Sequence, residues 1–129
     1  MDAAQALADL TEISSQIQSA VLFDEGGAVH GSTLGRDTAA AGLAAAAARL
    51  LDAADELAGD AEHVTQLEAA TAEGSVFVVR DGPRRIAATT GRAPTVGLVF
   101  YDLKSCLRST ADEPEKPKRA RRKQADVDA

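Results

Sequence analysis

The chain has 129 residues, of which 45% are hydrophobic and 3% aromatic, and its formal net charge is −6. This length corresponds to one domain. A membrane-spanning helix is excluded, because no stretch of about 18 apolar residues is free of charge. The excess of acidic side chains disfavours binding to nucleic-acid phosphates. The single cysteine, Cys106, excludes a disulfide framework and a multi-cysteine metal site. The amino terminus lacks the basic and apolar pattern of a secretion signal. Together these two features lead us to expect a cytoplasmic protein.

Residues 2–15 are predicted to form an amphipathic helix, because Ala3, Leu7, Leu10, Ser14 and Ile17 recur at helical spacing. Asp2 is placed to cap its first turn. Residues 17–24 then alternate as a half-buried strand does, and Asp24-Glu25-Gly26-Gly27 is a turn sequence in which glycine supplies a positive φ. Together with a weaker strand over residues 28–34, this pattern predicts a β-hairpin.

A long helix is predicted to follow a cap at Asp37 or Thr38, to run to about Ala58 and to end at Gly59. The stripe expected to face the core is Leu43, Ala47, Leu50, Ala54 and Leu57, with Leu51 on its flank, whereas Asp52, Asp55 and Glu56 are expected to be solvated. The outward positions are small: Ala41, Ala45 and Ala48 on the far side, and Gly42, Ala46, Arg49 and Ala53 beside them. A solvated helix normally carries Lys and Glu there, so this surface indicates either alanine's high helix propensity or a face that a partner covers.

Three more strands are predicted over residues 63–70, 75–80 and 84–90, and the fully apolar run Val76-Phe77-Val78-Val79 is typical of a central strand. Residues 94–108 favour a helix, because their apolar positions follow 3–4 spacing through Val96, Val99, Phe100, Leu103, Cys106 and Leu107. This order predicts an α+β domain over residues 1–110, with three helices on a five-stranded, mostly antiparallel sheet.

Residues 111–129 are predicted to be a disordered charged tail, since Val127 is their only large apolar side chain. Their basic residues are Lys116, Lys118, Arg119, Arg121, Arg122 and Lys123. A tail of this kind usually keeps a protein soluble. Contact with nucleic acid or with a membrane surface is the alternative, which a salt-dependent binding assay would reveal.

Catalytic and metal-binding patterns are missing from the sequence. The stretch from Gly26 to Thr33 has the spacing of a phosphate-binding loop, but Ser32 replaces the lysine that such a loop needs, and the stretch joins two strands. His30 and His63 are the only histidines and have no cysteine or paired carboxylates at ligand spacing. Cys106 lies on an apolar helix stripe, as a core side chain does. We therefore expect no enzyme activity, no cofactor and no metal.

The sequence resembles the Roadblock/dynein light chain domain family, in its bacterial branch of regulators of Ras-like GTPases. The resemblance covers about residues 5–109 and rests on the order of several segments: the opening helix with Leu7 and Leu10, residues 17–24 with their Glu25-Gly26-Gly27 turn, the small-residue second helix, residues 75–80, residues 85–91 and residues 96–100. It implies a fold close to profilin and longin-like modules. It also implies a homodimer in which third strands pair edge to edge and second helices lie side by side.

The same resemblance implies binding of a small Ras-like GTPase on the helical face of the dimer, with activation achieved by positioning the GTPase's own catalytic groups. We expect the partner-binding residues to be Ala41, Gly42, Ala45, Ala46, Ala48, Arg49 and Ala53, and the dimer edge strand to contain Val64, Thr65, Gln66, Leu67 and Glu68. No proline or lysine protects that strand from pairing. Two alternatives remain: a structural dimerisation adaptor without GTPase contact, and a small-molecule sensor, although few aromatic residues are available to line a pocket.

Overall fold

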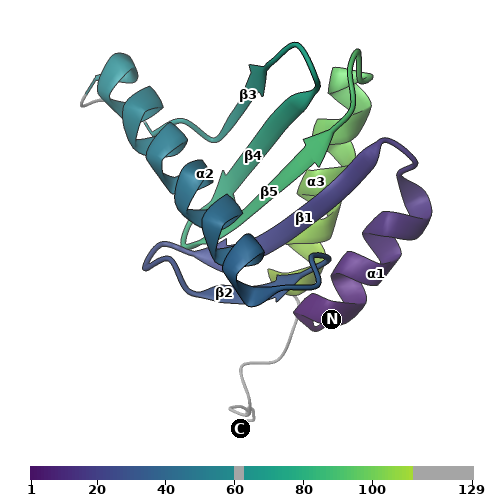
Figure 1. The fold of residues 1–129 in the computed structure, drawn as a ribbon. Helices are drawn as coiled ribbons and strands as arrows, with labels where there is room; N and C mark the ends of the chain where they lie inside the picture. Colours follow the sequence, from purple (N-terminus) through teal and green to yellow (C-terminus); the bar gives the residue numbers. More distant parts are fainter. Residues whose placement is uncertain (60–62, 112–129) are drawn as a thin grey trace, which may run out of the picture.

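A computed structural model describes residues 1–59 and 63–111 of the chain. Within these residues three helices and five strands follow the order α1 (Ala3–Ile13), β1 (Ile17–Asp24), β2 (Val29–Ser32), α2 (Asp37–Ala58), β3 (Gln66–Ala70), β4 (Ser75–Asp81), β5 (Arg84–Thr90) and α3 (Val96–Ala111) (Figure 1). The predicted α+β class and element order are confirmed. The tail is predicted over residues 111–129, but Ala111 is the last residue of α3, and residues 112–129 lie outside the described part of the chain.

The five strands form one sheet in the order β2-β1-β5-β4-β3, and each neighbouring pair is antiparallel. The register places Val78 opposite Ala87 and Ala87 opposite Val21, so these side chains share one face. Phe77 and Ile86 alternate to the other face. Because both faces of the three central strands carry apolar side chains, each face needs a covering layer.

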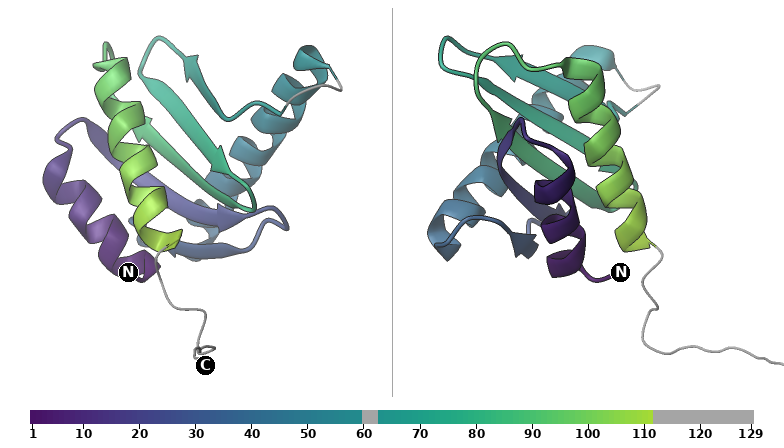
Figure 2. Two further views of the ribbon diagram at one scale, coloured as in Figure 1. Left: turned by 180° about the vertical axis from the view of Figure 1, so that it is seen from behind. Right: turned by 90° about the vertical axis from the view of Figure 1, so that its right-hand side faces the viewer.

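Two helices cover one face of the sheet and the third covers the other. Figure 2 shows α1 and α3 side by side on the face opposite α2. The core beneath α1 and α3 includes Leu7, Phe77, Ile86 and Leu103, all almost fully buried. The core beneath α2 is smaller and richer in alanine, and its members are Val21, Phe23, Ala40, Ala44, Ala47, Leu51, Val78 and Ala87.

The single cysteine belongs to the larger core, as predicted. Cys106 is 6% exposed, and its thiol donates a 3.5 Å hydrogen bond to the carbonyl of Ala6. Burial, assisted by the negative charge of Asp9, raises the pKa of the Cys106 thiol to about 11. The thiol is therefore protonated at neutral pH and contributes packing to the α1–α3 interface.

The helix termini agree only in part with the sequence prediction. Asp2 caps α1, and its Oδ1 accepts a 2.8 Å hydrogen bond from the backbone N–H of Gln5, as expected. The N-cap of α2 is Arg36, without a side-chain cap bond, so the predicted cap at Asp37 or Thr38 is wrong. The helix begins at Asp37, one residue earlier than a cap at Asp37 requires and two earlier than a cap at Thr38 requires. Gly59 ends α2 with a φ of 87°, a conformation that glycine adopts readily.

Two predicted strands are shorter in the structure than in the sequence prediction. β2 covers Val29–Ser32 and not residues 28–34. β3 begins at Gln66, so residues 63–65 are not part of the predicted strand over 63–70. At Val64, the backbone N–H bonds to Asp55 and the carbonyl accepts from Arg80. The carbonyl of Thr65 still accepts a 2.8 Å hydrogen bond from the backbone N–H of Arg80, so residues 64 and 65 stay against β4 although the regular pairing ends at Gln66.

Candidate functional site

The position of α2 on the sheet leaves part of that face uncovered. α2 packs chiefly on β1, β2 and β5. Its buried positions are Ala40, Ala44, Ala47 and Leu51. The predicted core stripe is confirmed in part: Ala47 and the flanking Leu51 are buried, Leu43, Leu50 and Ala54 are half-buried at its edge, and Leu57 is 91% exposed. The three alanines let the helix lie close to the sheet, and the leucines point to one side.

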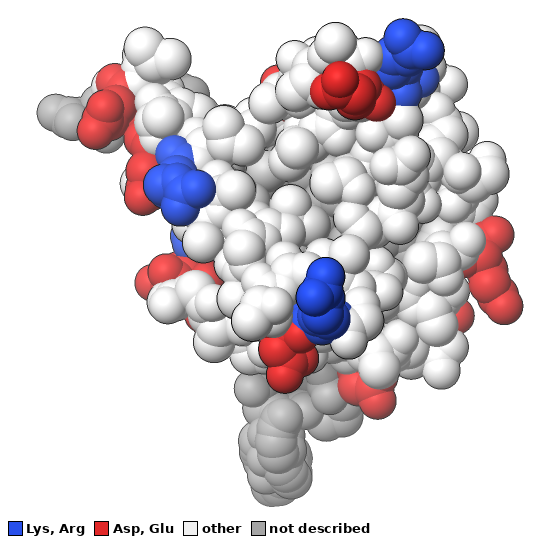
Figure 3. All heavy atoms as spheres, in the orientation of Figure 1, with Lys and Arg blue, Asp and Glu red and all other residues white. Residues whose placement is uncertain are grey.

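We call this uncovered apolar area the open face and define it by Leu43, Leu50, Leu57, Leu67 and Val76. Leu67 of β3 and Val76 of β4 are half-buried and pack against the same cluster as Leu43 and Leu50. Figure 1 shows the outer strands running past α2 without a helix above them. In Figure 3 the described charged side chains on this side of the molecule lie around its border. An apolar area with a charged border is typical of an interaction surface.

Small residues alternate with the leucines along this side of α2. Leu43, Leu50 and Leu57 are seven residues apart, and Ala46 and Ala53 stand between them at the 3–4 spacing of a helix-pairing seam. Ala46 is half-buried and Ala53 exposed. Leucine supplies apolar contact area, and alanine permits close approach of a second helix.

The predicted partner-binding residues are mostly on the surface. Ala41, Gly42, Ala45, Arg49 and Ala53 are exposed, whereas Ala46 and Ala48 are half-buried. Ala48 packs against the core beneath α2. The set therefore does not form one continuous stripe: its exposed members face away from the sheet, and Ala46 and Ala48 lie on opposite flanks of the helix.

The predicted dimer strand is at one edge of the sheet, with β4 as its neighbour in the described chain. Gln66, Leu67 and Glu68 belong to β3, but Val64 and Thr65 precede it. The hydroxyl of Ser75 on β4 donates a 3.0 Å hydrogen bond to Glu68, which holds this side chain toward β4. The other edge of β3 presents backbone donors and acceptors to a further strand.

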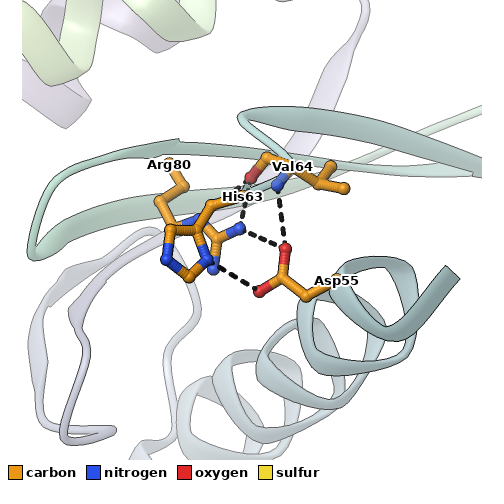
Figure 4. Close-up of polar contacts among 4 residues, drawn as sticks. All are labelled: Asp55, His63, Val64 and Arg80. Carbon is orange, nitrogen blue, oxygen red and sulfur yellow. Dashed lines mark hydrogen bonds and ion pairs between the residues drawn. The ribbon is translucent and has the colours of Figure 1, made fainter. Parts of the chain in front are cut away.

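A polar cluster anchors the chain that leads into β3 (Figure 4). Arg80 of β4 donates to Asp55 of α2 at 2.7 Å, and its Nε donates to the carbonyl of Val64 at 2.9 Å. Asp55 also accepts from the backbone N–H of Val64 at 2.8 Å, and it lies 3.6 Å from Nδ1 of His63. The Arg80 guanidinium, followed by the Val64 N–H, holds the pKa of the Asp55 carboxyl well below its ordinary value.

This cluster corrects the expectation that Asp55 belongs to a solvated acidic face. Its side chain is 23% exposed and that of Arg80 is 10% exposed. The cluster joins α2, β4 and the residues before β3, so it fixes where the edge strand begins. Sequence reasoning missed Arg80, because the partners are 25 residues apart and no local spacing links them.

The described residues contain neither a cluster of metal-binding side chains nor a membrane-spanning helix. Within residues 1–59 and 63–111 no group of three or more His, Cys, Asp or Glu is placed to hold a metal ion, and no helix there is long and apolar enough to cross a membrane. His30 pairs with Asp24 at 2.8 Å at the surface. Residues 26–33 form the turn after β1 and the strand β2, as predicted, and lack the helix that a phosphate-binding loop precedes.

Solved structures with the same fold are similar to this chain. A Roadblock/LC7 domain from Streptomyces avermitilis superimposes with a TM-score of 0.78 and 21% identity, over 86% of this chain and 96% of that one. MglB with a tetrameric arrangement gives a TM-score of 0.65 and 18% identity, over 84% of this chain and 85% of that one. Myxococcus xanthus MglB gives a TM-score of 0.63 and 16% identity, over 84% and 82%.

A search of curated protein sequences finds no significant match. The family comparison is decisive, because its match to the Roadblock/LC7 domain covers residues 4–89, about two thirds of the chain. The sequence resemblance and the element order agree with this result. This chain belongs to the Roadblock/LC7 domain family.

Proposed function

We propose that this protein is a non-enzymatic homodimer that binds a small Ras-like GTPase and regulates or scaffolds its nucleotide cycle. The observation that carries the proposal is the open face beside the edge strand β3. An exposed leucine on α2, half-buried apolar side chains on β3 and β4, and an edge without Pro or Lys together favour a partner at this place.

A second copy of the chain can bind at the open face through both backbone hydrogen bonds and side-chain packing. Antiparallel pairing of two β3 strands satisfies the edge donors and acceptors of both. It also brings two α2 helices together, where Leu50 and Leu57 of one copy pack against the small Ala46 and Ala53 of the other. Leu57 is 91% exposed in the single chain, so its burial between two copies contributes favourable free energy to dimerisation.

The GTPase is proposed to bind the outward side of the paired helices. Ala41, Gly42 and Ala45 expose little beyond backbone and methyl groups, so another protein can approach closely. Arg49 is exposed beside them and is the proposed polar anchor. Dimerisation doubles this area, which brings it nearer to the size of a specific interface.

The dimer is tested by replacing the most exposed leucine. Leu57→Lys leaves the fold of the single chain intact and places a charge in the proposed seam, so sedimentation velocity is expected to show a shift from dimer to monomer. Leu98→Lys is the matched control, because Leu98 is 51% exposed on α3, away from α2. A monomeric wild-type protein at micromolar concentration contradicts the proposed dimer.

GTPase binding is tested by calorimetry with purified small Ras-like GTPases of the source organism, loaded with GDP or with a non-hydrolysable GTP analogue. Ala45→Arg is expected to weaken binding at least tenfold without changing the dimer, whereas Ala8→Arg on the exposed side of α1 has no effect. Equal affinity of Ala45→Arg and wild type removes α2 from the contact. A stable partner that binds equally in both nucleotide states and is not itself a GTPase favours the structural adaptor instead.

A further inference from the structure

A second surface feature lies on the opposite side of the sheet from the open face. α1 and α3 lie side by side there (Figure 2), and a groove of about 300 Å³ runs between them. Its apolar wall includes Leu10, Ile13 and Tyr101, of which Ile13 is 71% exposed and Tyr101 65% exposed. Ser109 marks the end of the groove near the last turn of α3.

Two carboxylates line this apolar groove. Asp102 of α3 is only 7% exposed, and it has no ion-pair partner within residues 1–59 and 63–111. Asp9 of α1 accepts a hydrogen bond from Gln5 and lies close enough to Cys106 for its charge to act on that thiol. A nearby cation stabilises an ionised carboxylate in largely apolar surroundings. The groove is therefore suited to a segment that carries basic side chains on long apolar stems.

We propose that the basic segment 116–123 of this same chain occupies the groove between α1 and α3. This segment contains Lys116, Lys118, Arg119, Arg121, Arg122 and Lys123. Their ammonium and guanidinium groups pair with Asp9 and Asp102, and their methylene stems cover the apolar wall. An arginine over the exposed ring of Tyr101 adds a cation–π contact.

The length of the chain supports this occupant. α3 ends at Ala111, and Asp102 lies nine residues back along the helix, a distance of about 14 Å at 1.5 Å per residue. Lys116 lies five residues beyond Ala111, a reach of about 17 Å at full extension. Lys116 is thus the first basic residue after α3 and the first that can reach the carboxylate when the chain folds back.

Charge also favours this segment over a second folded copy. Residues 1–111 carry 8 basic and 15 acidic side chains, so another folded domain brings mostly like charge to Asp9 and Asp102. Residues 116–123 are the densest group of cations in the sequence. The proposal does not depend on the GTPase, because the groove lies on the other side of the sheet from α2.

The test is paramagnetic relaxation in the full-length protein. Ala125→Cys introduces a thiol next to the basic segment, and it can be spin-labelled selectively because Cys106 is buried. We expect loss of amide signal intensity at Ile13, Tyr101 and Ser105, and none at Ala45 on the opposite side. Because the attraction is ionic, raising the salt concentration to about 1 M is expected to restore the lost intensity.

Two variants separate this contact from a change in folding. Asp102→Asn, in the spin-labelled protein, is expected to restore the groove signals, whereas Asp52→Asn on exposed α2 leaves them attenuated. Replacement of Lys118, Arg119, Arg121 and Arg122 by Glu restores them without touching the described fold. Unattenuated groove signals in the spin-labelled protein overturn the proposal. So does attenuation found only between molecules, in a mixture of spin-labelled and isotope-labelled protein.

Discussion

The carboxylate of Asp55 on α2 meets the guanidinium of Arg80 on β4 at 2.7 Å, across 25 residues of sequence. Both also bond to the backbone of Val64, one to its N–H and the other to its carbonyl. The pair therefore connects α2 and β4 to the segment that enters the edge strand β3. In this way it connects the stability of the fold to the position of the open face.

Arg80→Met is expected to destabilise the protein. The substitution keeps much of the apolar stem but removes the hydrogen bonds to Asp55 and Val64, and Arg80 is 10% exposed. We expect the free energy of unfolding in urea to fall by about 1–3 kcal/mol. Arg92→Met, on an exposed loop, is the control and should change it by less than about 0.5 kcal/mol. Equal stability of the two variants contradicts a structural role for the cluster.

The stability of the protein should depend on pH through Asp55. Its pKa in the folded state lies below the ordinary value of 3.8, because Arg80 and the Val64 N–H favour the ionised form. Its contribution is therefore present above about pH 4 and is lost as the pH falls below that value. Urea unfolding at a series of pH values from 7 to 3 measures the beginning of this loss, which continues at lower pH toward the folded-state pKa.

Asp55→Asn is expected to reduce the fall in the free energy of unfolding as the pH is lowered. Asp52→Asn, on the exposed part of the same helix, is expected to leave that fall unchanged. The remaining decline in Asp55→Asn should come in part from Asp24. Its pKa is lowered by hydrogen bonds from His30 and from the backbone N–H groups of Ala28 and Gly26. If the free energy of unfolding falls with pH equally in wild type and Asp55→Asn, the Asp55–Arg80 pair does not contribute to the pH dependence of stability.

The sequence was sufficient for the elements but not for the rotation of α2. Periodicity located every helix and strand, and Asp2 and Cys106 behave as predicted. In α2 the alanines that face the sheet cannot be distinguished by composition from those that face solvent. The prediction gave weight to the larger leucines and so centred the stripe on the flank of Leu43 and Leu50, whereas the side that packs on β1 and β5 is mostly alanine.

The candidate surface was predictable in part for the same reason. The exposure of Ala41, Gly42, Ala45 and Arg49 agrees with the sequence pattern, since any orientation that buries Ala44 and Ala47 exposes them. The side occupied by Leu43, Leu50 and Leu57 was not predicted, because it depends on how far α2 extends across the sheet. That extent is determined by tertiary contacts such as Asp55–Arg80, which have no local sequence signal.

The corrected orientation of α2 can be checked with two leucines. Leu51 is 1% exposed, so Leu51→Ala removes buried methyl groups and should lower the free energy of unfolding by about 2–5 kcal/mol. Leu57→Ala should cost less than about 0.5 kcal/mol in dilute monomer. If Leu57 is buried only between two copies, its effect grows with protein concentration, whereas that of Leu51 does not. A larger loss of stability in Leu57→Ala than in Leu51→Ala would contradict this orientation of α2 and support a core stripe that includes Leu57.

Glycines at two positions are expected to respond in opposite ways to alanine. At Gly74, in the turn between β3 and β4, a Cβ would lie 2.1 Å from the carbonyl oxygen of Thr90, and backbone atoms cannot yield as a side chain does. Gly74→Ala should therefore destabilise the protein by about 1–3 kcal/mol. At Gly42, inside exposed α2, nothing lies within 4 Å of the added Cβ. Gly42→Ala should stabilise the helix by about 0.5–1 kcal/mol, because alanine loses less backbone entropy on folding.

Urea unfolding of both variants at the same low protein concentration measures these changes. A stable Gly74→Ala protein means that the β3–β4 turn can move away from β5, so the edge strand is held less tightly than the structure indicates. Gly42 has a second use, since it lies in the proposed GTPase-binding surface. If Gly42→Ala gains stability and yet loses GTPase affinity, the absence of a side chain there serves the partner and not the helix.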